Sequence, residues 1–296
     1  MTTDDGEDGH GPVLVAAVGT GVGAPIDHDQ VVDVVRAAVE GVVQRAMGIE
    51  LTWGVSAFLR SDDLGAWFPA SPMGADGLDW EFVRGRLRHG QPQAIAVSAQ
   101  SAVMRADFDR DPDPARINPR IYVADVHVSF PFEAPWATGP LGGLAVRAAM
   151  SRWAMYGGGE RLDWIAPALH EWVVETSAAL DADTGYVAAD EHHLSDAGSD
   201  WERQHHLSPG YRDLRRRLWG FGWGTLLGPT QLAAVGGVER LREASDRIRP
   251  LPGGRAWVDL GEEPAAVPPE ALRRLRVVLD PVLRRPEHRP DGVVEP

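Results

Sequence analysis

The chain of 296 residues contains no cysteine and no lysine. The absence of cysteine excludes disulfides, thiolate metal ligands and cysteine nucleophiles. The absence of lysine excludes Schiff-base chemistry and any phosphate-binding loop that depends on a lysine. All 29 basic residues are therefore arginine, and together with many Ala, Gly, Val and Pro residues this is typical of GC-rich actinobacterial sequences.

The sequence also lacks an apolar run of the roughly 18–20 residues that a membrane helix requires. Residues 1–11 are acidic, whereas a secretory signal needs a basic stretch before an apolar one. We therefore expect a cytoplasmic protein that makes no membrane contact. Residues 1–11 and 286–296 are expected to be disordered tails, and residues 12–285 a single domain, with a two-lobed arrangement around a seam near residue 157 left open.

The acidic residues give the chain a net charge of −14, and this charge is unevenly spread. Residues 1–210 carry 14 arginines and 31 acidic residues, a net charge of −17. Residues 211–296 carry 15 arginines and 12 acidic residues, a net charge of +3. An acidic body repels phosphates, so we expect no nucleic-acid partner, whereas a basic protein would be attracted and steered.

Periodicity along the chain predicts an α+β fold. Alternating or continuous apolar runs predict strands over residues 13–18, 50–57, 93–103, 120–130, 186–190, 219–227, 247–251 and 255–260. Helical spacing predicts helices over residues 29–47, 79–89, 140–156, 162–180, 229–244 and 269–284. Many strands are neighbours in the sequence, which favours a largely antiparallel mixed sheet with helices packed on one face.

The most unusual predicted strand is Trp219–Leu227, in which Trp219, Phe221 and Trp223 alternate with glycines. A period of two would place the aromatic rings on one face and bare backbone on the other. The glycine face then invites close approach, most simply by a helix packed flat against it.

Several motifs have a functional and a structural interpretation. The segment Gly19–Ala24 fits a G-x-G-x-x-A dinucleotide fingerprint, but Pro25 delays the following helix, which favours a simple turn. His170 and Glu171 begin a zinc-peptidase-like pattern, but position 174 is valine. Glu171 and Glu175 share a helix face, and we interpret them as surface residues.

Four histidines cluster between residues 192 and 206, with carboxylates nearby. Imidazole and carboxylate groups could ligate zinc or iron. Adjacent histidines on an extended segment point in opposite directions, so each pair offers about one ligand. We interpret the segment as a charged loop and assign no metal or cofactor. The four residues are His192, His193, His205 and His206.

The C-terminal third carries a series of aromatic and glycine motifs: Tyr186-Val-Ala, Trp219-Gly-Phe-Gly-Trp-Gly-Thr-Leu-Leu-Gly-Pro, Leu232-Ala-Ala-Val-Gly-Gly-Val-Glu-Arg-Leu and Pro250-Leu-Pro-Gly-Gly-Arg-Ala-Trp-Val. Over residues 184–285 this series resembles the type VI immunity protein family. The resemblance implies a toxin-neutralising protein without catalytic residues.

The leading hypothesis is therefore a non-enzymatic protein that neutralises a basic protein toxin, with a nuclease as one candidate, through acidic, Trp-bearing loops at residues 60–80 and 107–113. The candidate partner-binding residues are Trp67, Asp76, Asp79, Asp109, Asp111, Asp113 and Trp201. The alternative is an enzyme of actinobacterial specialised metabolism, with a site near Trp219–Gly224 and the histidine loop. A subunit of a larger assembly is a third interpretation.

Overall fold

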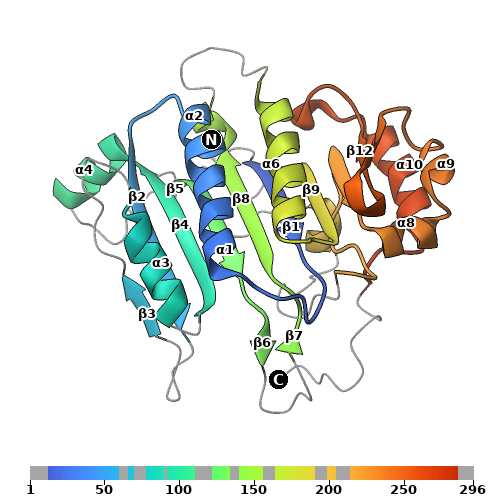
Figure 1. The fold of residues 1–296 in the computed structure, drawn as a ribbon. Helices are drawn as coiled ribbons and strands as arrows, with labels where there is room; N and C mark the ends of the chain where they lie inside the picture. Colours follow the sequence, from blue (N-terminus) through green and yellow to red (C-terminus); the bar gives the residue numbers. More distant parts are fainter. Residues whose placement is uncertain are drawn as a thin grey trace, which may run out of the picture.

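A ten-stranded antiparallel sheet forms the centre of the described structure (Figure 1). The computed structural model describes residues 13–59, 66–69, 78–89, 92–110, 122–133, 140–155, 164–190, 199–204 and 214–285. Ten strands pair in the order β11-β12-β10-β9-β1-β8-β5-β4-β2-β3, and every pairing between neighbours is antiparallel. The predicted α+β class with a largely antiparallel sheet is confirmed.

The strands of the sheet are β1 (Val13–Gly19), β2 (Leu51–Leu59), β3 (Ala66–Pro69), β4 (Pro92–Ser101), β5 (Tyr122–Ser129), β8 (Ala145–Ser151), β9 (Thr184–Asp190), β10 (Gly224–Leu227), β11 (Ile248–Leu251) and β12 (Arg255–Asp259). Two short strands, β6 (Phe132–Glu133) and β7 (Pro140–Leu141), pair separately. The first strand lies at the centre of the sheet, because Val15 is opposite Ala149 of β8 on one side and Ala188 of β9 on the other.

The α-helices of the described chain are α1 (His28–Arg36), α2 (Gln44–Ala46), α3 (Trp80–His89), α4 (Ala102–Arg110), α5 (Arg152–Met155), α6 (Ile165–Ala179), α7 (Asp200–Gln204), α8 (Pro229–Val235), α9 (Val238–Leu241) and α10 (Pro269–Leu279). A π-helical stretch, Ala37–Val43, joins α1 to α2, and two 3-10 turns lie at Pro252–Gly254 and Pro264–Ala266. No helix in this part of the chain is both long enough and apolar enough to cross a membrane.

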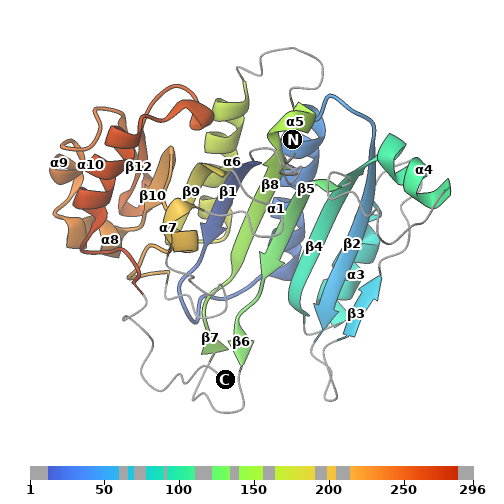
Figure 2. The same cartoon turned by 180° about the vertical axis from the view of Figure 1, so that it is seen from behind.

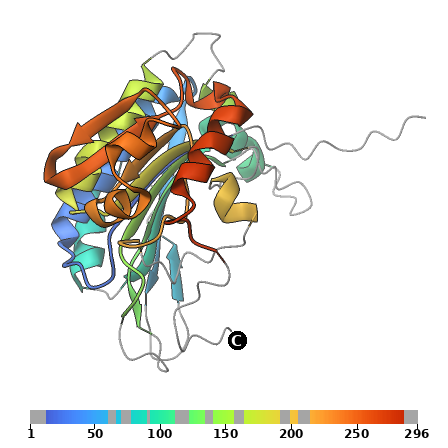
Figure 3. The same ribbon diagram turned by 90° about the vertical axis from the view of Figure 1, so that its right-hand side faces the viewer.

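The two faces of the sheet are covered by different helices, and not one face alone as the sequence predicted (Figures 1, 2 and 3). Helices α1, α3 and α6 pack on one face, where Leu14, Ala16 and Val18 of β1 join the larger apolar core. On the opposite face, α10 packs over the C-terminal strands, where Leu227 and Val258 belong to a second apolar cluster. Because side chains alternate along a strand, β10 and β12 contribute to both: Leu226 and Trp257 belong to the larger core, and Leu227 and Val258 to the second cluster.

Local sequence signals fixed several elements correctly. The Asp27 carboxylate accepts hydrogen bonds from the backbone N–H groups of Asp29 and Gln30 and caps the predicted first helix. Asp79 caps α3 in the same way, accepting from Phe82 N at 3.0 Å. The two strands predicted over residues 247–251 and 255–260 pair as β11 and β12, with the Pro252-Gly253-Gly254 turn between them.

The predicted helix over residues 140–156 is wrong. Residues Ala145–Ser151 form β8, a central strand, and only Arg152–Met155 after it are helical. Alanine and methionine favour helices locally, but this strand buries side chains on both of its faces. A strand covered on both sides has no polar alternation to mark it, so burial in the sheet overrode the local preference.

The predicted strand over residues 219–227 is too long. Only Gly224–Leu227 pair as β10, and the three aromatic side chains before it point to different neighbours. Trp223 contacts Trp257, with ring centroids 6.2 Å apart, whereas Phe221 belongs to the second cluster. Close approach at the glycines is confirmed, but by a strand and not by a helix: a Cβ on Gly222 would lie 2.4 Å from the carbonyl oxygen of Val187 in β9.

Candidate binding pocket

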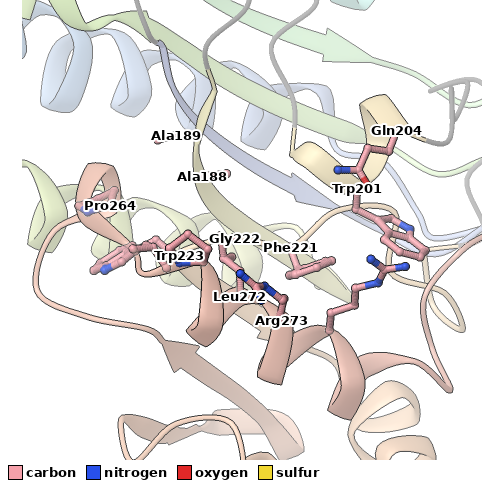
Figure 4. A pocket seen from close by; sticks show the side chains of 13 residues that line it. Ala188, Ala189, Trp201, Gln204, Phe221, Gly222, Trp223, Pro264, Leu272 and Arg273 are labelled. Atoms are coloured by element: carbon pink, nitrogen blue, oxygen red, sulfur yellow. The ribbon is translucent and has the colours of Figure 1, made fainter.

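A pocket of about 330 Å³ lies where β9, α7 and α10 meet (Figure 4). Strand β10 pairs with β9 only up to Val187, opposite Gly224. The end of β9 therefore extends beyond its partner, and the chain before β10 bends away from it. The residues that line the pocket are Ala188, Ala189, Trp201, Gln204, Phe221, Gly222, Trp223, Pro264, Val267, Pro269, Leu272, Arg273 and Arg276.

Small residues make one wall of this pocket. Ala188 and Ala189 carry only methyl groups, and Gly222 lies against the backbone of Val187 with no room for a Cβ. A ligand at this wall would approach main chain directly, with no large side chain between.

Aromatic rings whose indole N–H groups are hydrogen-bonded make another part of the lining. Trp201 donates its indole N–H to the carbonyl of Arg284 at 2.7 Å, and Trp223 donates to the carbonyl of Gly261 at 3.0 Å. The Trp201 and Phe221 rings are tilted against each other at a centroid distance of 6.2 Å. Each indole therefore has a fixed orientation, and its apolar surface lines the pocket.

A buried carboxylate positions the helix that carries Trp201. Glu202 is 8% exposed and accepts hydrogen bonds from the Tyr186 hydroxyl, from Ser199 N at 3.0 Å and from Ser199 Oγ at 3.2 Å. Burying a carboxylate is costly unless several donors surround it. This network ties α7 to β9 and so holds Trp201 beside the pocket.

Two arginines of α10 stand at the pocket. Arg273 pairs with Glu270 one turn earlier, at 3.1 Å. The guanidinium of Arg276 lies 4.8 Å from the centroid of the Trp201 ring, a cation–π arrangement. Within the described chain, Arg276 forms no ion pair with a carboxylate. The pocket therefore combines an apolar lining with a positive side.

Of the seven predicted partner-binding residues, the structure places Trp201 in this pocket. It is only 3% exposed, so it is a buried wall and not an exposed anchor. Asp79 is exposed and is used as a helix cap. Trp67 lies on β3 and Asp109 on α4, and the side chains of both are outside the described part. Asp76, Asp111 and Asp113 also lie outside the described residues.

No local pattern in the sequence points directly to the rest of the pocket. Arg273 and Arg276 lie on a helix that was predicted from its apolar stripe, and helical spacing alone does not indicate which arginine faces a cavity. The aromatic residues Phe221 and Trp223 were singled out, but as one face of a strand. They line a common pocket because the chain joins the sheet only at Gly224, and these two residues, which lie just before it, are free of strand pairing.

The turn at Gly19–Ala24 does not have the geometry of a phosphate-binding loop. The backbone N–H of Gly21 already donates to the carboxylate of Asp183 at 2.7 Å, and a Cβ on Gly19 would lie 2.1 Å from the side chain of Leu214. The amide and the space that a pyrophosphate would need are taken by the protein itself. The interpretation as a turn agrees with these contacts.

The predicted histidine cluster lies outside the described residues. Within the described part of the chain, no group of three His, Asp or Glu side chains is placed to hold a metal ion. The alternative enzyme hypothesis also invoked a strand over Trp219–Gly224, which the structure replaces by an irregular segment.

Two titratable groups outside the pocket have shifted pKa values. Burial raises the pKa of Asp125, although Arg147 and the Ser98 hydroxyl, at 3.0 Å, oppose the shift. Burial and then the charge of Arg249 lower the pKa of His170, whose ring packs edge-on against Trp257 at 4.8 Å. His170 is therefore a core-edge residue, and Glu171 and Glu175 beside it are exposed, as predicted.

Comparison with known proteins gives one informative similarity. No protein-family model matches the chain, and no curated protein matches it. Among solved structures, the fold is similar to that of the Pseudomonas aeruginosa T6SS protein PA0821, with a TM-score of 0.54 and 12% sequence identity. The similarity covers 92% of this chain and 73% of that one, so the two proteins share a fold.

Proposed function

We propose that this chain is a non-enzymatic binding protein that neutralises a protein toxin of a type VI secretion system. The observation that carries the proposal is the fold similarity to a T6SS protein over 92% of the chain. The motifs that resemble the type VI immunity family, over residues 184–285, lie within that common fold.

The structure explains why those motifs are made of glycines. Gly236 and Gly237, between α8 and α9, have φ values of 97° and 84°, and Gly253 and Gly254 at the hairpin turn have 75° and 73°. Residues with a Cβ rarely adopt this region. The glycines of these motifs therefore support a shared architecture.

The net negative charge of the chain supports a basic partner, and the ion pairs of the fold indicate which surface is left to attract it. On α1 and α3, acidic residues are largely neutralised within the fold: Arg84 lies 3.2 Å from Asp29 and 3.3 Å from Asp33, and Arg88 lies 2.6 Å from Asp29. The hydrogen bond from Arg88 lowers the pKa of Asp29. This helical face therefore has little net charge to attract a partner, which favours the predicted segments at residues 60–80 and 107–113 as the contact surface. These segments are not all loop, since they include β3 (Ala66–Pro69) and the end of α4 (Ala102–Arg110).

The first test is native mass spectrometry of the protein purified gently from its own cells. We expect a stoichiometric basic polypeptide that is toxic when it is expressed alone and harmless when it is co-expressed with this chain. A polypeptide that binds but whose toxicity is unchanged by co-expression would contradict the proposal. A bound metal or small molecule without a protein partner would favour the enzyme alternative.

Charge reversal tests the contact surface. Changing Asp109, Asp111 and Asp113 to arginine should weaken binding of that polypeptide and flatten its dependence on salt, because exposed charges steer association. The matched control changes three exposed acidic residues elsewhere to arginine: Glu171, Glu175 and Asp246. Equal loss in both triple variants would mean that only the overall charge matters, and the proposed surface would be wrong.

A further inference from the structure

The pocket between α7 and α10 has features that a purely acidic contact surface would not need. It has an aromatic lining, a wall of small residues and an arginine that no carboxylate of the described chain neutralises. Its charge is opposite in sign to that of residues 1–210. These features together indicate what kind of ligand would fit.

Apolar surface in the pocket favours an apolar side chain. Leu272, which is partly buried, and the edges of the Trp201 and Trp223 rings, which are 3% and 4% exposed, present carbon surface, and the hydrogen bonds of the two indole N–H groups are already satisfied. An inserted side chain would remove this surface from water without leaving a polar group unpaired. Well-packed pockets of this type are where binding energy concentrates in protein interfaces.

The charge of Arg276 favours a carboxylate beside that side chain. Its guanidinium is held over the Trp201 ring, so less side-chain freedom is lost when it binds. A carboxylate is a strong partner for guanidinium because both hydrogen bonds are charge-assisted. Arg273, on the same helix, adds positive charge, although Glu270 partly neutralises it.

The size and the wall of the pocket favour a peptide over a cofactor. A volume of about 330 Å³ is at the lower end of the range for pockets that enclose a whole small molecule. Beyond Val187, no strand of the described chain pairs with β9 on the side of β10. Gly222 and the Pro264–Ala266 turn already pack against this end of β9, and Ala188 is 5% exposed, so a partner segment would cross the mouth of the pocket and insert one side chain.

We propose that this pocket anchors an extended segment of a partner protein in which an aromatic or aliphatic side chain lies next to a glutamate or aspartate. This inference shares one premise with the proposed function, namely that the chain binds another protein. It adds to the acidic surface a second contact of opposite charge, which would fix the orientation of the partner.

The test uses capped dipeptides as probes, so that it does not depend on the toxin. The full chain is labelled with 5-fluorotryptophan, and the Trp201 resonance is assigned with Trp201→Phe. We expect acetyl-Phe-Glu-amide to shift that resonance with a Kd about tenfold lower than acetyl-Phe-Gln-amide or acetyl-Ala-Glu-amide, because each control probe lacks one of the two features.

Variants on α10 identify the residues responsible. Arg276→Gln should reduce the affinity for acetyl-Phe-Glu-amide to that for acetyl-Phe-Gln-amide. Arg274→Gln is the matched control, since Arg274 is exposed on the same helix but does not line the pocket. Leu272→Glu places a carboxylate one turn before Arg276 and should block the probe, whereas Leu272→Gln should weaken it less.

Equal affinity for all three dipeptides, or equal losses in Arg274→Gln and Arg276→Gln, would overturn the inference. Tighter binding of free 3-phenylpropionate than of the dipeptide would also overturn it, in favour of a small-molecule site. If the dipeptides bind as expected but no toxin is neutralised, the pocket assignment stands and the proposed function fails. If no dipeptide binds the unmodified chain and the toxin is still neutralised by Arg276→Gln, the proposed function stands and the pocket assignment fails.

Discussion

The buried side chain of Gln231 offers the sharpest test of how the C-terminal part is held together. Gln231 is 0% exposed. Its Oε1 accepts from the backbone N–H of Gly228 at 3.1 Å, and its Nε2 donates to the carbonyl of Leu214 at 2.7 Å. One side chain therefore caps α8 and ties it to the segment that leads into the aromatic residues of the pocket.

Replacing Gln231 with Ala removes both hydrogen bonds and leaves a buried N–H and a buried C=O without their partner. Each unsatisfied buried group costs about 1–3 kcal/mol, so we expect a loss of about 2–6 kcal/mol in the free energy of unfolding. With a urea m-value of about 2–3 kcal/mol/M, the unfolding midpoint should fall by about 1 M or more.

Urea unfolding followed by tryptophan fluorescence and by far-UV circular dichroism measures this loss, and coincident transitions show that the two-state treatment applies. The control is Gln204→Ala, an exposed glutamine whose loss should change stability by less than about 0.5 kcal/mol. Gln231→Glu should be least harmful at low pH, because only a protonated carboxyl can donate to Leu214. A loss below about 0.5 kcal/mol in Gln231→Ala would refute the reasoning.

Three further predictions concern buried groups and close contacts. Burial raises the pKa of Asp125, so the folded state binds this proton more tightly than the unfolded state does, and stability is lost as pH rises above about 4. In urea titrations at several pH values, the stability of Asp125→Asn relative to the unmodified protein should therefore increase from pH 3.5 to 7. The pKa of His170 is lowered, so stability should fall as pH drops below about 6.5, and thermal melts of His170→Gln should show a smaller fall between pH 7 and 5. Gly222→Ala would place a Cβ 2.4 Å from the Val187 oxygen and should cost about 3 kcal/mol or more in the free energy of unfolding, measured in urea. Its control, Gly85→Ala on α3, meets nothing within 4 Å and should stabilise the protein by about 0.5–1 kcal/mol, so similar effects of the two changes would contradict the close approach at β9.

Local sequence signals were sufficient where each structural choice depends on neighbours in the chain. Asp79 caps a helix because its carboxylate reaches a backbone N–H three residues later, and Gly253 turns the hairpin because it tolerates positive φ. The apolar stripe of α10 predicted its buried face, including Leu275 and Leu279. These features follow from spacing alone, so the fold class and most elements could be predicted.

Only the tertiary structure decided the features that depend on distant partners. Ala145–Ser151 became a central strand because β1 and β5 pair with it on its two edges, which no local pattern in this Ala-rich stretch records. Trp201 and Arg276 are 75 residues apart and meet only because α7 and α10 pack on the same face of the sheet. The sequence by itself determined an acidic α+β protein without cysteine or lysine chemistry, whereas the pocket depends on long-range packing that brings these residues together.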